Sequence, residues 1–133
     1  MIPVMCRVKD DPENGSYGDC LRACVASMLD LDAEAVPHFH QHGPEQAARG
    51  WEDMAAFLRE RGYYPFVTRS EDDPREVLQE CGHYLLCGST RAGSNHVVVC
   101  KGAEMVHNPA WVPCSLVGPC DDGFWTIIVF AKA

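Results

Sequence analysis

Three residues that lie far apart in the sequence have the chemical types that nucleophilic attack on a carbonyl group requires. Cys20 opens an apolar stretch with helical spacing, His96 begins a run of β-forming residues, and Asn108 stands before a proline. At the start of a helix, unpaired backbone N–H groups and the helix dipole favour a thiolate, which is the nucleophilic form of cysteine. A histidine supplies the general base, and a carboxamide fixes its tautomer. The sequence therefore predicts a Cys20–His96–Asn108 triad.

Other interpretations of these residues stay open. His83 and His107 are alternative bases, although strand alternation places His107 on the face opposite Asn108 and so favours His96. Cys20 could instead be a small buried apolar residue. His96 could be an ordinary polar residue at the edge of a strand, and Asn108 could be a turn residue whose side chain bonds its own backbone.

The element that must position Cys20 is an amphipathic helix over residues 18–30. Asp19 precedes its apolar stripe and is expected to cap the helix N-terminus. The residues of the stripe are Leu21, Cys24, Val25, Met28 and Leu29. A short turn of helix is expected over residues 31–37, and a second long helix over residues 45–62, because apolar residues again recur at helical spacing.

The second half of the chain has the pattern of β-structure. Strands are expected over residues 63–68, 83–88, 96–101, 104–107 and 124–130. Pro65 favours an edge position for the first of these strands. Residues 1–8 could form a further short edge strand, and residues 73–80 are expected to form a short helix capped by Asp73.

The order of the elements predicts the fold class and the meeting of the triad. Helices come first and antiparallel strands second, which is typical of an α+β domain with a central helix against a small sheet. Residues 1–133 are expected to form one domain. A tight hairpin at Gly102-Ala103 would bring residues 96 and 108 to the same end of the sheet.

The composition argues against two classes of partner. The formal net charge is −8 and no Lys/Arg cluster offsets it, which disfavours binding to nucleic acid. No apolar run approaches the roughly 20 residues that a membrane-spanning helix needs. We therefore expect no nucleic acid and no membrane among the partners.

The eight cysteines include no C-x-x-C pair, and residues 1–6 do not resemble an export signal. We therefore expect reduced thiols in a cytoplasmic protein without a cofactor. Cys114 and Cys120 lie in a loop-like stretch and have no assigned role. Three alternate histidines, His38, His40 and His42, could bind a metal, but no neighbouring ligand completes a site, and an exposed loop is the preferred interpretation.

Three short motifs carry a resemblance to a known family. They are Gly18-Asp19-Cys20 at the helix start, Asn95-His96-Val97-Val98-Val99, and His107-Asn108-Pro109. Together they resemble the papain-like cysteine peptidase superfamily, and are most similar to small bacterial and phage proteins related to the C39 peptidase domains. The resemblance implies a papain-like fold and a thiol-dependent hydrolase or acyl transferase. Its substrate would be a peptide or protein, attacked at a peptide, isopeptide or glutamine amide bond.

The family places a glutamine, which donates to the oxyanion, about six positions before the nucleophile. Here Asn14 occupies that position and is expected to take the role. The chain also lacks room for a second substrate-binding lobe, so a small or single-tail substrate is expected. The oligomeric state stays open.

A binding module without turnover is the alternative function. A phage protein of this kind would bind a host factor. The expected contact surface lies in the loop over residues 110–122 and consists of Trp111, Val112 and Leu116.

Overall fold

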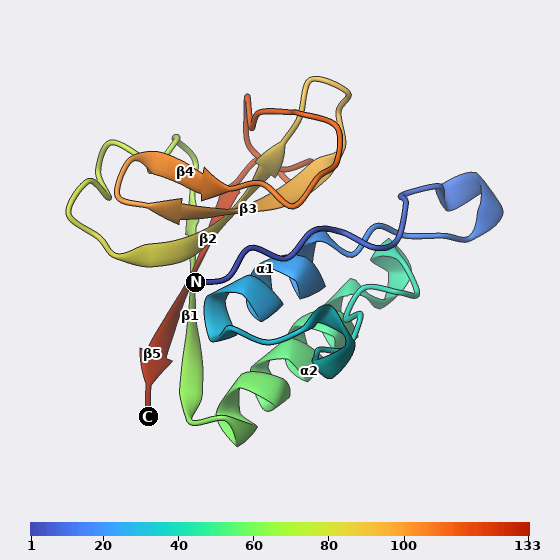
Figure 1. Ribbon diagram of the computed structural model, residues 1–133. Helices are drawn as coiled ribbons and strands as arrows, with labels where there is room; N and C mark the ends of the chain where they lie inside the picture. Colours follow the sequence, from blue (N-terminus) through green and yellow to red (C-terminus); the bar gives the residue numbers. More distant parts are fainter.

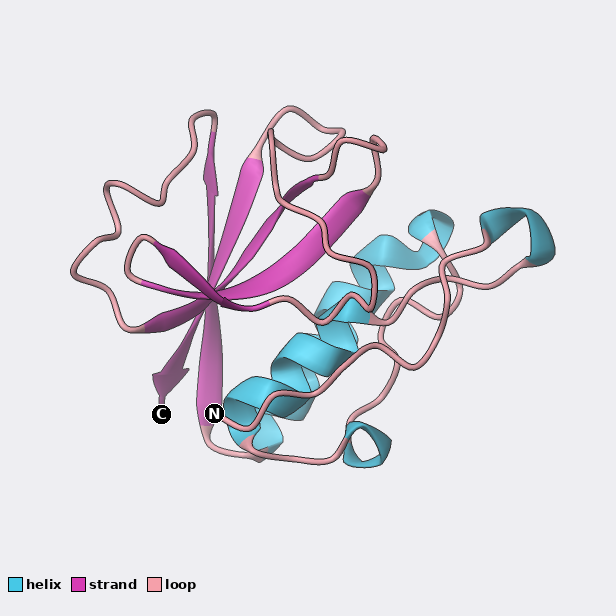
Figure 2. Cartoon of the chain, turned by 45° about the horizontal axis from the view of Figure 1, so that its top comes forward, coloured by secondary structure: helices cyan, strands magenta, loops and turns pink.

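In the computed structural model, which describes residues 1–133, two helices cover one face of a five-stranded antiparallel sheet (Figures 1 and 2). The helices are α1 (Cys20–Leu29) and α2 (Ala47–Glu60). The strands are β1 (Tyr63–Ser70), β2 (His83–Ser89), β3 (Asn95–Lys101), β4 (Glu104–His107) and β5 (Trp125–Lys132). Their order in the sheet is β1-β5-β2-β3-β4. The predicted α+β class is therefore confirmed, and neither helix has the length and apolar character needed to cross a membrane.

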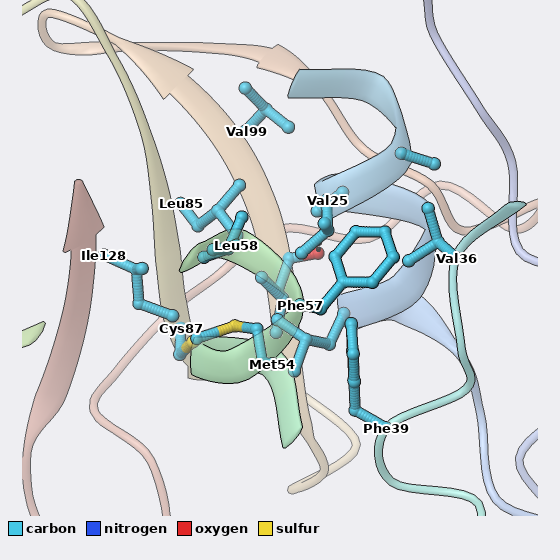
Figure 3. Close-up of a cluster of buried hydrophobic side chains, with 14 residues drawn as sticks. Val25, Val36, Phe39, Met54, Phe57, Leu58, Leu85, Cys87, Val99 and Ile128 are labelled. Carbon is cyan, nitrogen blue, oxygen red and sulfur yellow. Dashed lines mark hydrogen bonds between the residues drawn. The ribbon is translucent and has the colours of Figure 1, made fainter. Parts of the chain in front are cut away.

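Both faces of the central strands are buried, which explains their continuous apolar runs. The face toward the helices packs Leu85 and Val99 against Val25 of α1 and Leu58 of α2 (Figure 3). The opposite face carries a second buried cluster, whose members are Tyr84, Leu86, Val98, Cys100, Leu116, Trp125 and Ile127. Leu116 is only 4% exposed, so its predicted place on a contact surface is wrong.

Two predicted elements are absent. Residues 73–80 form turns instead of a helix, although Asp73 makes the bond expected of a helix cap: its carboxylate accepts from the Arg75 backbone N–H at 3.0 Å. Only one bond of helical spacing follows, from the Leu78 N–H to Pro74 O at 3.0 Å. Residues 1–8 run in an extended conformation without joining the sheet. The edge position of β1 is confirmed, because β1 pairs only with β5.

Residues 4–10, which we call the N-terminal strap, connect α1 to the chain that follows β4. On one side, the Val4 N–H donates to Ser27 Oγ of α1 at 2.8 Å. On the other side, His107 Nε2 donates to Val4 O at 2.7 Å, and the Cys6 N–H donates to Pro109 O at 2.9 Å. In Figure 1 the strap (dark blue) runs along α1. These bonds satisfy backbone groups that a sheet would otherwise have paired.

Asp19 holds the strap against α1 instead of capping the helix. Its Oδ1 accepts hydrogen bonds from the Arg7 and Val8 N–H groups at 2.9 and 3.0 Å, and its Oδ2 binds the Arg22 guanidinium at 2.8 Å. No side-chain cap bond forms. The predicted cap is therefore wrong, because strap donors and an arginine one helical turn away occupy the carboxylate.

Gly50, which is buried in α2, gives a test of how closely this helix packs. A Cβ atom at Gly50 would clash with the His40 ring and lie 2.7 Å from Phe39 O. A helical Gly→Ala change usually stabilises by up to about 1 kcal/mol, but overpacking costs about 1–3 kcal/mol. We therefore expect Gly50→Ala to lower the free energy of unfolding measured in urea. The control Gly82→Ala, where a Cβ meets nothing within 4 Å, should be nearly neutral, and stabilisation by Gly50→Ala would contradict the packing.

Candidate active site

The β3–β4 hairpin brings His96 and Asn108 into direct contact, as the sequence predicts. His96 is the second residue of β3, and Asn108 directly follows β4. Their side chains form a hydrogen bond of 2.8 Å between His96 Nε2 and Asn108 Oδ1. The hairpin contains a β-bulge between Val99 and Cys100 that shifts the register by one residue, and this shift puts His96 and Asn108 on the same face.

The surroundings of Asn108 determine the tautomer of His96. The Asn108 amide nitrogen donates to Cys114 O at 2.8 Å, and its Oδ1 accepts from the Ala110 N–H at 3.0 Å. Oδ1 therefore faces His96 as an acceptor, so Nε2 of the ring must carry a hydrogen. In the neutral ring this leaves Nδ1 with a free lone pair, which is the form that a general base needs.

Cys20 and His96 line one open cavity of about 590 Å³. Cys20 enters it as the first residue of α1. The strap forms one wall with residues 6–10, and the other residues that line the cavity are Gly18, Ser94, Asn95, Ala110, Trp111 and Val112. Asn108 lies behind His96, away from the cavity lining. The structure thus gathers the three predicted residues, with the thiol and the imidazole both open to a ligand.

The cavity keeps the Cys20 thiol protonated. Burial raises its pKa to about 11, and the neighbouring Asp19 and Asp10 carboxylates act in the same direction. Hydrogen bonds from the backbone of Val97 and Leu21 lower the pKa and offset only part of this effect. The expectation that the helix N-terminus would stabilise a thiolate is therefore wrong, because desolvation outweighs the backbone hydrogen bonds that favour the thiolate.

Burial also lowers the pKa of His96, and the hydrogen bond to Asn108 raises it by a smaller amount. At neutral pH the site therefore contains a neutral thiol and a neutral imidazole. Such a pair can work if the imidazole removes the thiol proton during attack, as in general base catalysis.

Asn14 lies outside this cavity. It belongs to the 3-10 turn η1 (Pro12–Asn14), at the tip of a loop that projects away from the sheet (Figure 1). Its exposed amide donates to Asp11 Oδ2 at 2.7 Å. This corrects the expectation that Asn14 would bind an oxyanion. The donor that remains next to the nucleophile is the backbone N–H of Cys20, which has no helical partner at the start of α1.

The other histidines make contacts elsewhere. His83 is exposed at the far end of β2, opposite Lys101, and the His107 ring bonds the strap. His38 Nε2 bonds Tyr17 O at 2.7 Å, and His40 packs edge-on against Trp51. No three metal-binding side chains gather in the structure.

Two residues have roles beside the site that were not predicted from the sequence. Asp19 is 1% exposed and immediately precedes the nucleophile, and its spacing from Arg22 would have indicated the ion pair. Cys6 lines the cavity through the strap, and no local pattern points to it, since its placement depends on tertiary contacts.

The site is therefore a thiol and an oriented imidazole at one end of a small sheet. Comparison of the chain with protein-family models, with curated proteins and with solved structures finds no match. What the site can do must be inferred from its own residues.

Proposed function

We propose that this protein is a papain-like thiol-dependent hydrolase or acyl transferase that acts on an amide bond. The observation that carries the proposal is the 2.8 Å bond between His96 and Asn108 at a cavity that also contains Cys20. Peptide, isopeptide and glutamine amides share the same chemistry at the carbonyl group. An open cavity of about 590 Å³ in a small domain has room for one extended peptide tail or one side chain of a protein substrate.

In the proposed reaction, Cys20 Sγ forms a bond to the carbonyl carbon while its proton passes to His96 Nδ1. The carbonyl oxygen becomes negative beside the Cys20 N–H. His96 then returns the proton to the departing amine nitrogen as the C–N bond breaks, which leaves a thioester on Cys20. Water or a second amine releases the acyl group, with His96 again taking a proton. Asn108 keeps the ring in the required orientation throughout.

The test uses p-nitrophenyl acetate as an acyl donor. We expect acetylation of Cys20 ahead of the seven other cysteines, seen by peptide mapping, followed by turnover. Because burial lowers the His96 pKa below its usual 6.5, the ring is in its neutral, basic form at neutral pH. The acylation rate should therefore rise with pH only in the acid range and be constant at neutral pH and above. A rate that keeps rising toward pH 11, the pKa of the Cys20 thiol, would indicate a free thiolate without a base and would contradict the proposal.

A second candidate function is a papain-like binding module without turnover. The observation in its favour is the exposure of Trp111 and Val112, 74% and 77%, at the rim of the cavity. The same experiment separates the two functions. A binding module would show no preferential acetylation of Cys20 and no turnover.

A further inference from the structure

A second thiol shares the cavity with Cys20. Cys6 belongs to the strap and Cys20 to α1, and both side chains are half-buried and line the same space. The two segments are joined beside the thiols, since the Arg7 and Val8 N–H groups bond Asp19 Oδ1 at 2.9 and 3.0 Å. Arg7 follows Cys6 and Asp19 precedes Cys20, so these bonds hold the two cysteines on adjacent stretches of chain.

The electrostatics of Cys6 agree with this placement. Burial raises the pKa of its thiol to about 12, and the next contributions come from the Cys20 thiol and the Asp19 carboxylate. Cys6 thus lies within the electrostatic reach of the Cys20 thiol, and no cation contributes to the pKa shift of either thiol.

Cys24 is the main competing partner for Cys20, and the geometry disfavours it. Both residues lie on α1, where side chains four positions apart point in the same direction. A disulfide between them would require distortion of the helix. Cys24 is also fully buried, and its thiol donates to Val97 O at 3.4 Å. Cys6 lies on a separate and non-helical segment, which can adjust to the bond.

We propose that Cys6 and Cys20 form a reversible disulfide that removes the cavity's nucleophile under oxidising conditions. This modification site goes beyond the proposed function, and it depends only on the placement of the two thiols.

The oxidant is a small disulfide such as oxidised glutathione. The Cys20 thiolate attacks one sulfur and releases one glutathione thiolate, which gives a mixed disulfide on Cys20. The Cys6 thiolate then attacks Cys20 Sγ and releases the second glutathione. Two electrons and the two thiol protons thus pass from the protein to glutathione. Neither protein thiolate is stabilised, so the reaction should accelerate with pH, and the disulfide should lack the strong oxidising character of low-pKa pairs.

The experiment treats the whole protein with oxidised glutathione, blocks the remaining thiols and maps the peptides by mass spectrometry. We expect a cross-link between the peptides of Cys6 and Cys20, and its disappearance after dithiothreitol. Cys6→Ser and Cys6→Ala should abolish the cross-link and leave glutathione attached to Cys20. The control Cys114→Ser, which changes a half-buried cysteine outside the cavity lining, should form the cross-link normally.

Three outcomes would overturn the proposal. One is a link from Cys20 to Cys24, the second is mixed disulfide on Cys20 that persists in the wild type, and the third is no change at Cys20 while exposed Cys81 reacts. The readout is covalent and needs no substrate. A protein that fails to turn over p-nitrophenyl acetate but forms the cross-link would reject the proposed function and keep this inference.

Discussion

Replacement of His96 by alanine is expected to lower the rate of Cys20 acetylation by p-nitrophenyl acetate about 10²–10⁴-fold at neutral pH. The reason is the state of the thiol. With a pKa of about 11, only about 10⁻⁴ of Cys20 is thiolate at pH 7, so attack depends on a base that removes the proton during bond formation. The measurement is the first-order rate of nitrophenolate release, with peptide mapping to confirm the acetylated residue.

Two controls make this result specific. His83→Ala removes an exposed histidine at the far end of β2 and should leave the rate unchanged. Added imidazole should restore part of the rate in His96→Ala, since the missing ring leaves space in an open cavity of about 590 Å³. An undiminished rate in His96→Ala, with Cys20 still acetylated, would remove His96 from the mechanism.

Asp19→Ala is expected to lower the free energy of unfolding by about 3–5 kcal/mol, the usual cost of removing one partner of a buried ion pair. The change would leave the Arg22 guanidinium without its carboxylate and the Arg7 and Val8 N–H groups without an acceptor. Urea unfolding of the variant measures the effect. Asp53→Ala, an exposed aspartate on α2, is the matched control and should change the stability little.

The contribution of Asp19 should depend on pH in a defined direction. Burial favours the protonated form, but hydrogen bonds from Val8, Arg22 and Arg7 outweigh it and hold the pKa below its usual value. The pKa of Asp19 is lower in the folded state than the value of about 4 in the unfolded state. The stabilisation by its carboxylate is therefore fully present above about pH 4, and it is lost as the pH falls through the folded-state pKa. The stability difference between wild type and Asp19→Ala should therefore shrink in acid. A difference that stays constant down to about pH 2 would contradict the role of the ionised carboxylate.

Much of this protein follows from patterns that are local in the sequence. Apolar residues at helical spacing determined α1 and α2, and uninterrupted β-forming runs determined β2, β3 and β5. The sequence placed His96 and Asn108 at the same end of a hairpin, but their contact depends on a β-bulge that the sequence pattern did not show. In the regular register of a two-residue hairpin, Asn108 would lie opposite Val97, on the face that His96 does not share. The bulge in the pairing of β3 with β4 shifts the register by one residue and puts Asn108 on the face of His96.

The errors have different physical origins. Asp73 makes the expected capping bond to the Arg75 N–H, yet only one backbone bond of helical spacing follows. Asn14 is held by Asp11 in a turn of its own. Leu116 was expected on an exposed surface of the loop over residues 110–122, yet it belongs to the buried cluster on the second face of the sheet.

The sequence by itself thus determined most of the elements, their order, and the candidate site residues Cys20, His96 and Asn108. Only the tertiary structure decided the protonation state of the Cys20 thiol and which groups surround it. The strap brings Cys6 to the cavity and turns Asp19 away from its expected cap, and burial raises the Cys20 pKa to about 11. Burial and long-range hydrogen bonds depend on how distant segments pack against each other, and the spacing of residues along the chain does not determine that packing.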